Sequence, residues 1–107
     1  MNKLTMETLE DYIQETYRDF QSDQGMFMKL VEEVGEIAEL MNIRDGRKSG
    51  DADIKEDLAK ELADVIHYTV AIAVINHIDL CKAIIDKDTK AATKYNHPIN
   101  LKAFMEK

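Results

Sequence analysis

Five acidic residues are spaced so that they could act together in chemistry. Glu32, Glu33 and Glu36 lie within five consecutive positions, and Glu61 and Asp64 form an i, i+3 pair further along the chain. Successive residues of an α-helix are rotated by about 100°, so the first three carboxylates share one edge of a helix and the last two share an edge of another. Helices joined by a short turn are usually antiparallel neighbours, so we expect the two sets to face each other across one groove.

The chemistry that this pattern favours is the binding of a divalent metal ion. Carboxylates that converge at close range repel one another unless protons or cations neutralise them. Mg²⁺ prefers oxygen ligands and keeps water ligands, leaving room for a substrate phosphate. We therefore expect a Mg²⁺ site, in which Mn²⁺ could substitute. Gly35 supports this interpretation, because a glycine inside a helix costs about 1 kcal/mol relative to alanine and so indicates the close approach of another backbone or a ligand.

Other interpretations of the same residues exist. A solvated helix surface would carry such pairs by chance, and Glu56 with Lys60, and Lys60 with Asp64, have the i, i+4 spacing of surface ion pairs. A di-iron carboxylate bundle is suggested by Asp64 and His67, but that design needs two Glu-x-x-His units and a second copy is missing. A non-enzymatic acidic interaction module would explain the net charge. It would not explain the position of Gly35 or the matched spacing of the acidic residues on two successive helices. We favour the metal site and expect His67 to be a core or interface residue.

The elements that must position these carboxylates are helices. Apolar residues recur at helical spacing and strand-like alternation is absent, so the fold is predicted to be all-α. The third helix should begin with a capping box made by Asp53 and Glu56, after a polar break at residues 44–51. We expect helices from Thr5 to about residues 21–24, from about Gly25 to Asn42, from the capping box to about Asn76, and from Asp79 to about Tyr95, with a short helical turn near the end.

The apolar stripes of these helices predict an antiparallel bundle of about four helices, in a single domain that covers residues 1–107. Residues 65–75 are apolar nearly all round, which implies burial on every side. A bundle this small can hardly surround a helix, so we expect the chain to assemble into a larger oligomeric bundle. The residues expected to face inward are Leu9, Tyr12, Ile13, Tyr17, Phe20, Phe27, Leu30, Val31, Val34, Ile37, Ala38, Met41, Ile54, Leu58 and Leu62.

Composition and charge exclude several classes of protein. The 14 Lys and Arg are outnumbered by 21 Asp and Glu, for a net charge of −7, so a free-standing nucleic-acid binder is not expected. Cys81 is the only cysteine, which fits a reducing cytoplasm, and we expect it to be a small apolar core residue. The first residues contain no apolar segment of a secretory signal, and residues 65–75 are too few to span a bilayer. We therefore expect a soluble cytoplasmic protein without a membrane partner.

The acidic pattern also resembles that of a known family. The run Glu32-Glu33-Val34-Gly35-Glu36, with Glu61-Leu62-Ala63-Asp64 after it, resembles the E-E-x-x-E … E-x-x-D signature of the MazG-like all-α nucleotide pyrophosphohydrolases. The resemblance extends over roughly residues 29–98. It implies Mg²⁺-dependent hydrolysis of nucleoside triphosphates, ribo- or deoxyribo-, to the monophosphate and pyrophosphate, by a helical bundle assembled as a homo-oligomer, a dimer or a tetramer.

The same resemblance implies roles for individual residues. Glu33, Glu36, Glu61 and Asp64 would be the Mg²⁺ ligands, and Glu32 would orient or deprotonate the attacking water or help to hold a second Mg²⁺. The family also carries a basic stretch, approximately K-x-x-K-N-x-x-R-Y-P, that contacts the phosphates. Residues 87–98 resemble it with departures: Ala91 in place of asparagine, Lys94 in place of arginine, and Asn96-His97 inserted before Pro98. The implied phosphate-binding residues are Lys29, Lys87, Lys90, Lys94 and Tyr95.

Overall fold

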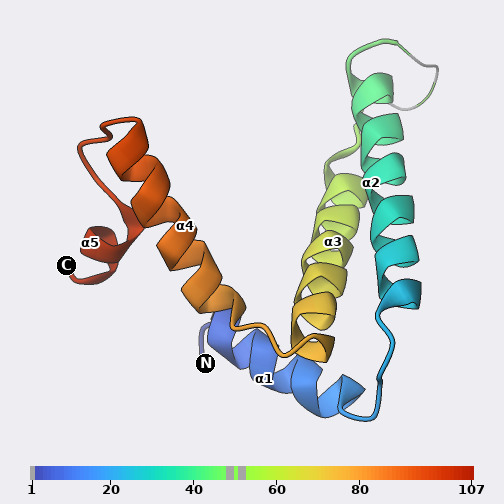
Figure 1. The fold of residues 1–107 in the computed structure, drawn as a ribbon. Helices are drawn as coiled ribbons and strands as arrows, with labels where there is room; N and C mark the ends of the chain where they lie inside the picture. The colour runs from blue at the N-terminus through green and yellow to red at the C-terminus, as the bar shows by residue number, and fades with distance from the viewer. Residues whose placement is uncertain (1, 48–49, 51–52) are drawn as a thin grey trace.

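The regular elements of the chain are all α-helices, which confirms the predicted fold class. The computed structural model describes residues 2–47, 50 and 53–107, and within these residues there is no strand (Figure 1). Of the predicted polar break, residues 48, 49 and 51 lie outside the described residues. Four long helices precede a short fifth one: α1 Met6–Tyr17, α2 Gln24–Arg44, α3 Lys55–Ile75, α4 Leu80–Lys94 and α5 Leu101–Met105.

Three helices begin at a residue whose side chain caps them. Thr5 accepts a hydrogen bond from the backbone N–H of Thr8 at 3.1 Å, and Asp79 accepts one from Lys82 N at 3.0 Å. Both caps were predicted and are confirmed, because a short polar side chain can satisfy the free N–H groups of the first turn. Asn100 caps α5 in the same way. α1 ends at Tyr17, earlier than predicted.

The predicted capping box at the start of α3 is wrong. The helix begins at Lys55, and Ile54 occupies the N-cap position without a side-chain hydrogen bond. The backbone of Ile54, at φ −105° and ψ 2°, is not yet helical, so the helix begins after it rather than after Asp53, and its side chain is 6% exposed. Glu56 then lies one position too early to complete a box, and its carboxylate is 4.0 Å from Lys60 Nζ instead.

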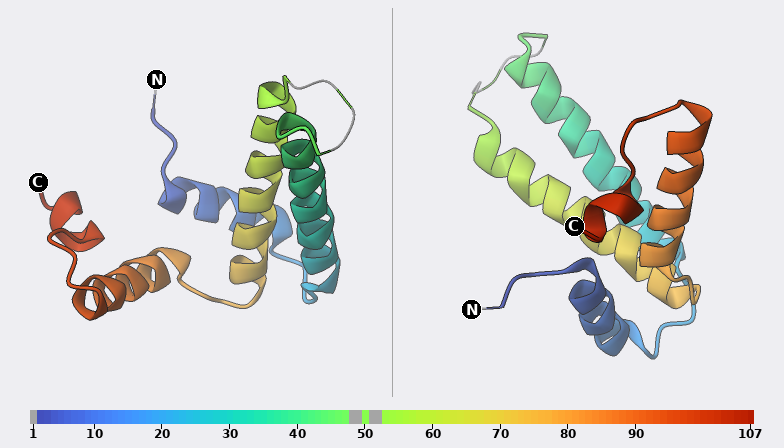
Figure 2. Two further views of the ribbon diagram at one scale, coloured as in Figure 1. Left: turned by 90° about the horizontal axis from the view of Figure 1, so that it is seen from above. Right: turned by 90° about the vertical axis from the view of Figure 1, so that its left-hand side faces the viewer.

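The hydrophobic core lies where α1 crosses α3. α2 and α3 run side by side as an antiparallel pair, and α1 lies across the end of α3 that precedes α4 (Figures 1 and 2). The most buried side chains at this crossing are Ile13, Val70 and Ala71, each at most 1% exposed. The core is therefore near the C-terminal end of α3, whereas the predicted site residues of α3 lie in its N-terminal half.

A polar contact also joins α1 to α3. Tyr17 Oη and His67 Nε2 are hydrogen-bonded at 2.7 Å, and the two rings meet edge to face with centroids 5.7 Å apart. His67 is therefore engaged in packing between helices, as expected from the missing second Glu-x-x-His unit. Since a hydrogen bond within a protein typically contributes about 1 kcal/mol, this partly buried pair helps to hold the helix that carries Glu61 and Asp64.

Residues 80–107, which we call the α4–α5 arm, extend away from the other helices. α4 is bent by 105° relative to α3. Its first turn is anchored, because Leu80 packs against the core and Cys81 Sγ donates a hydrogen bond to Glu10 Oε1 at 2.7 Å. Beyond that turn the extensive contacts of α4 are with α5, where Asp88 Oδ2 accepts a hydrogen bond from Leu101 N at 2.7 Å. The expected four-helix bundle is thus not closed within one chain (Figure 2).

The environment of Cys81 differs from the prediction of an apolar core residue. Its thiol is partly exposed and faces a carboxylate. The hydrogen bond to Glu10, followed by burial, raises the pKa of Cys81 to about 11, so the thiol stays protonated at neutral pH. As for membrane insertion, no single helix among the described residues is long and apolar enough to cross a bilayer, although α3 and α4 taken together meet that criterion across their bend.

Several apolar side chains that were expected to face inward are exposed instead. They form an apolar face on the α2–α3 pair, and helical geometry places Val34 about 160° around the axis from Glu36, and Leu62 and Ile66 about 160° from Asp64. The radius of gyration is 17.0 Å, whereas a compact chain of about 100 residues has about 13 Å. The large exposed residues on this face are Phe27, Val31, Val34, Leu62 and Ile66, and Tyr12 and Phe20 are exposed as well.

Gly35 has open space beside it in the described chain. A Cβ atom built on this residue would meet nothing within 4 Å, so no other segment of the described residues packs against it. Helical geometry also places Gly35 on the side of α2 away from Glu33, about 160° around the axis. Its position therefore provides no support for a ligand beside the carboxylates.

We expect Gly35→Ala to stabilise the protein. Because the residue lies inside α2 with open space around it, alanine should raise the free energy of unfolding by up to about 1 kcal/mol, the difference in helix propensity. Chemical denaturation of the metal-free protein would measure this change. A loss of stability together with a change in molecular mass would show that another subunit packs against this position.

Candidate metal centre

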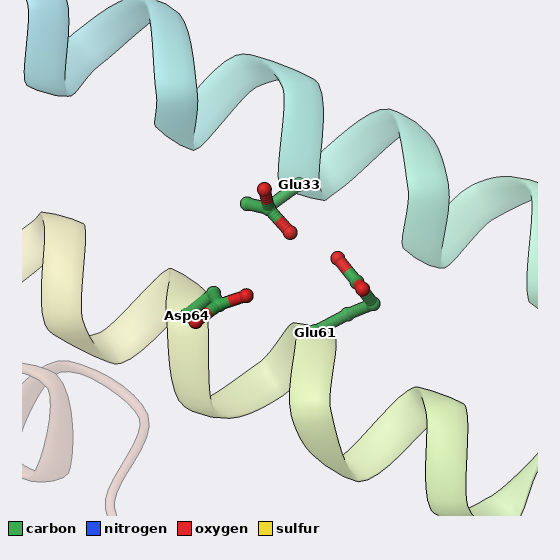
Figure 3. A group of neighbouring side chains, drawn as sticks. All are labelled: Glu33, Glu61 and Asp64. Atoms are coloured by element: carbon green, nitrogen blue, oxygen red, sulfur yellow. The ribbon is translucent and has the colours of Figure 1, made fainter.

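Three carboxylates from two helices converge in the groove between α2 and α3. Glu33 projects from α2, and Glu61 and Asp64 project from successive turns of α3, with their oxygens directed toward one another (Figure 3). One oxygen from each residue lies within 4.8 Å of the other two. Metal–oxygen distances of 2.0 to 2.6 Å separate the ligand oxygens of one cation by up to about 5 Å. The three groups can therefore bind the same ion.

Helical spacing explains why acidic side chains occupy a packing seam. Leu30 and Ile37 lie three residues before and four residues after Glu33, and all three are partly buried along the same stripe of α2. On α3, Leu58 and Val65 flank Glu61 in the same manner. Each helix therefore presents a carboxylate at a position where an apolar side chain would improve packing. Carboxylates at these positions lower the stability of the helix pair, which favours a functional reason for their presence.

The two carboxylates in the seam have buried oxygens without a partner. Glu33 Oε2 and Glu61 Oε2 are inaccessible to solvent and have no hydrogen-bond donor. Among the described residues, no lysine, arginine or histidine forms an ion pair with either group. Buried ionised groups without a partner are strongly unfavourable, so a proton or a cation must neutralise this pair.

Protonation of Glu61 is one way to neutralise the pair. The Glu33 carboxyl, which can accept a hydrogen bond from a protonated Glu61, is the main cause that raises the pKa of Glu61 from 4.5 to about 8, followed by the nearby Glu36 carboxyl and by some burial. In the metal-free protein at neutral pH, Glu61 is therefore mainly protonated. A hard divalent cation would displace this proton, and the donor set of oxygens without a cysteine or histidine fits such an ion.

Glu36 and Glu32, the two other predicted acidic site residues, are placed differently. Glu36 lies close enough to Glu61 to affect its pKa and lines a cavity of about 340 Å³ beside the three converging carboxylates. Glu32 is outside the group: its Oε2 lies 3.5 Å from Lys29 Nζ on the same helix, and both side chains are more than half exposed. The structure thus brings together Glu33, Glu61 and Asp64, with Glu36 at their edge.

Two further acidic residues line the same cavity and were not singled out from the sequence. Glu39 follows Glu36 by three residues, and Asp57 precedes Glu61 by four, so each extends its acidic edge by one turn. The helical spacing that identified the other residues could have identified these two. Larger hollows of about 530 and 570 Å³ lie against α4–α5 and between α1 and the start of α4, away from the carboxylates.

The lysines of the predicted phosphate-binding stretch do not face these carboxylates. Lys87, Lys90 and Lys94 lie on α4, within the arm that diverges from α3. Lys94 Nζ is 5.3 Å from the centroid of the Tyr95 ring, and Tyr95 is 62% exposed. Within one chain, the acidic and basic parts of the expected site are therefore apart.

Two comparisons with known proteins find similar sequences. A family model described as the MazG nucleotide pyrophosphohydrolase domain matches residues 21–98, a range that contains all the predicted site residues. The dCTP pyrophosphatase 1 proteins of Rattus norvegicus and Mus musculus are each 33% identical to this chain over 90 residues. The matched region is 79% of this chain and 51% of each relative, so the chain spans about half the length of these relatives. No solved structure matches the chain significantly.

The raised pKa of Glu61 predicts how stability depends on pH. Between about pH 4.5 and 8 the folded chain retains a proton that the unfolded chain releases, so stability should fall as the pH rises through this range. Thermal melting in a chelator at pH 5, 6.5 and 8 would measure the decline. Millimolar Mg²⁺ should raise the melting temperature most at pH 8, because Mg²⁺ displaces the proton of Glu61 most easily at that pH.

The Glu61→Gln variant provides the comparison for this experiment. Its amide cannot ionise, so the decline in melting temperature between pH 5 and 8 should be smaller than in the wild type. Glu56→Gln is the matched control, because the Glu56 side chain is 89% exposed on the same helix. If the melting temperatures of the wild type and of Glu61→Gln decline equally between pH 5 and 8, Glu61 does not hold the proposed proton.

Proposed function

Because the chain belongs to the MazG nucleotide pyrophosphohydrolase family, we propose that it hydrolyses nucleoside triphosphates to the monophosphate and pyrophosphate with Mg²⁺ as cofactor. The observation that carries this proposal is the pair of buried, unpartnered oxygens of Glu33 and Glu61, beside Asp64. Such a group is suited to a cation, and a triphosphate cannot approach these carboxylates unless their charge is offset.

The proposed reaction is the attack of water on the α-phosphorus. Glu33, Glu61 and Asp64, with Glu36 at the edge, would hold the metal. When bound, Mg²⁺ offsets the negative charge of the phosphates and makes an attacking water easier to deprotonate. Glu32 lies one position before Glu33 with an exposed carboxylate, so it would orient the water and accept its proton. The bond from the α-phosphorus to the bridging oxygen then breaks, and pyrophosphate leaves.

Lysine side chains would stabilise the leaving pyrophosphate. Lys29 is 3.5 Å from Glu32, so it lies on the edge of α2 that carries the acidic residues, where a phosphate could replace the carboxylate as its partner. Lys87, Lys90 and Lys94 supply further positive charge, and Tyr95 could donate a hydrogen bond from its exposed hydroxyl. Both ribo- and deoxyribonucleotides are candidates, and the names of the two relatives make dCTP the first nucleotide to test.

A purely structural role for the acidic residues fits these observations less well. An acidic interaction module would expose its carboxylates to solvent or to a basic partner. Glu33 and Glu61 instead direct oxygens into the seam between two helices of the same chain. This arrangement removes both carboxylates from water and gives neither of them an ion pair. A protein that only needed charge on its surface would not require it.

We also propose that the protein acts as a homo-oligomer, a dimer or a tetramer. The extended shape of the chain and the exposed apolar face on α2–α3 both support a second copy as the covering partner. Burial of apolar side chains is worth roughly 25 cal/mol per Å², so covering this face would stabilise the assembly.

For the reaction, we expect Mg²⁺-dependent release of pyrophosphate from a panel of ribo- and deoxyribonucleoside triphosphates. Asp64→Asn removes one ligand charge with little change in shape and should lower kcat about 100-fold or more. Glu56→Gln, which changes an exposed acid outside the group, should leave the rate unchanged. Full activity in Asp64→Asn, or no release from any nucleotide by the wild type, would refute the proposed function.

For the assembly, we expect Ile66→Glu to shift the protein toward monomers. Ile66 is 49% exposed on the apolar face, so in one chain the new carboxylate meets water, whereas in an interface it would be buried without a partner. Light scattering coupled to size exclusion measures the molecular mass. Gln14→Glu, on an exposed position of α1, is the control. An unchanged mass for Ile66→Glu would exclude this face from the interface.

A further inference from the structure

Lys29 and Glu32 form an exposed ion pair on α2, beside the groove that holds the three converging carboxylates. Lys29 Nζ lies 3.5 Å from Glu32 Oε2, and the two side chains are 57% and 60% exposed. Among the described residues, neither side chain has another ion pair or hydrogen bond. Each group is therefore the charge partner of the other as long as no ligand is bound.

This ion pair is held loosely. Its separation of 3.5 Å exceeds the roughly 2.7 to 2.9 Å of a well-formed hydrogen bond between an ammonium and a carboxylate. By contrast, Lys82 Nζ lies 2.6 Å from Asp86 Oδ2 on α4. Exposed ion pairs add little to stability, because water solvates both groups well. A stronger anion can therefore take Lys29 away from Glu32.

Helical geometry places Lys29 at the groove between α2 and α3. Lys29 precedes Glu33 by four residues, which corresponds to a rotation of about 40° and a rise of about 6 Å. It precedes Glu36 by seven residues, a rotation of only about 20°. Lys29 therefore lies on the acidic edge of α2, roughly one helical turn from the group that would hold the cation. A ligand bound to that cation through one phosphate could extend a second phosphate to Lys29.

We infer that the Lys29–Glu32 ion pair is an autoinhibitory contact that the phosphate chain of the substrate opens. This inference rests on the proposed function. A triphosphate carries several negative charges and a carboxylate carries one, so the phosphate chain attracts the ammonium of Lys29 more strongly than Glu32 does. When Lys29 turns to the phosphate, Glu32 Oε2 loses its partner and is free to accept a hydrogen bond from the attacking water. Substrate binding thus prepares the residue that acts on the water.

The same contact favours long phosphate chains. A nucleoside monophosphate bound to the cation has no further phosphate to offer Lys29, so the ion pair stays closed. A triphosphate extends beyond the cation and opens the pair. The exchange of partners therefore discriminates between the substrate and the nucleoside monophosphate that the reaction releases, and Lys29 is the residue that senses the difference.

A double-mutant cycle of ligand binding tests the exchange without turnover. The ligand is a dCTP analogue with an imido group between the α- and β-phosphorus atoms, in the presence of Mg²⁺. Calorimetry gives its Kd for the wild type, K29Q, E32Q and K29Q/E32Q. We expect K29Q to weaken binding about tenfold. E32Q should tighten binding about threefold when Lys29 is present, because the competitor for the ammonium is gone, and by a clearly smaller factor in K29Q.

Two outcomes of this cycle would overturn the inference. If E32Q changes the Kd by the same factor with and without Lys29, the ion pair does not open on binding. If K29Q binds the analogue as tightly as the wild type, Lys29 does not contact the phosphates. Both substitutions lie on an exposed part of α2 and keep the size of the side chain similar, so the variants should fold.

Lys82 and Asp86 provide the matched control. They form an exposed lysine–carboxylate pair on α4, and K82Q, D86N and K82Q/D86N make the same changes in charge. These substitutions should change the Kd of the analogue by less than about twofold, because exposed charges at a distance are largely screened. Coupling as large as that between Lys29 and Glu32 would indicate a general effect of charge and would overturn the inference.

The dependence on chain length gives a second binding measurement. K29Q should weaken the triphosphate analogue about tenfold and dCMP by less than about twofold. Equal weakening of both ligands would show that Lys29 does not sense the phosphate chain, and would also overturn the inference.

Pyrophosphate release separates this inference from the proposed function. Release by the wild type without coupling in the cycle would retain the proposed reaction and overturn the exchange of partners. Coupling in the cycle without release from any nucleotide would support the exchange and refute only the reaction. Absence of analogue binding to the wild type would refute both.

Discussion

The repulsion between Glu33 and Glu61 is the constraint on which the rest of this structure depends. Two carboxylates direct unpartnered oxygens into the seam between α2 and α3, where an apolar pair would pack better. At neutral pH they can coexist only if a proton or a cation lies between them, and the raised pKa of Glu61 expresses the same requirement. A divalent ion bound between Glu33 and Glu61 would therefore also stabilise the α2–α3 pair.

The chain tolerates this repulsion because its core lies elsewhere. The fully buried residues Ile13, Val70 and Ala71 gather where α1 crosses the C-terminal half of α3, and the Tyr17–His67 hydrogen bond reinforces the same crossing. α3 thus has a stabilising half and a half with carboxylates. Since the first half anchors the helix, the second half can hold Glu61 and Asp64 in place although their repulsion opposes packing there.

The described chain is more extended than a compact domain of its length. Its radius of gyration exceeds that of a compact domain of this length, its α2–α3 pair exposes an apolar face, and its basic arm leaves its own acidic body. The proposed homo-oligomer would cover the exposed apolar face. The net charge of −7 is unevenly distributed, because residues 1–79 have a net charge of −10 and residues 80–107 have a net charge of +3.

The sequence by itself determined the helices and the face of each helix that carries a given side chain. Spacing of apolar residues predicted the all-α class, local capping chemistry predicted the starts at Thr5 and Asp79, and the 100° rotation per residue predicted the shared edges of the acidic residues. These properties depend on residues a few positions apart, so the chain contains them before it folds. The same reasoning could have extended the acidic edges to Glu39 and Asp57.

Only the tertiary structure decided which of these side chains meet. Glu33 faces Glu61 and Asp64 while Glu32, its neighbour in sequence, pairs with Lys29, because the register of α2 against α3 selects one edge of each helix. α3 begins after Ile54 without a side-chain cap, and the bend after α3 directs the lysines of α4 away from the carboxylates. Register, burial and the direction of a connection depend on contacts between distant segments, which no local spacing specifies.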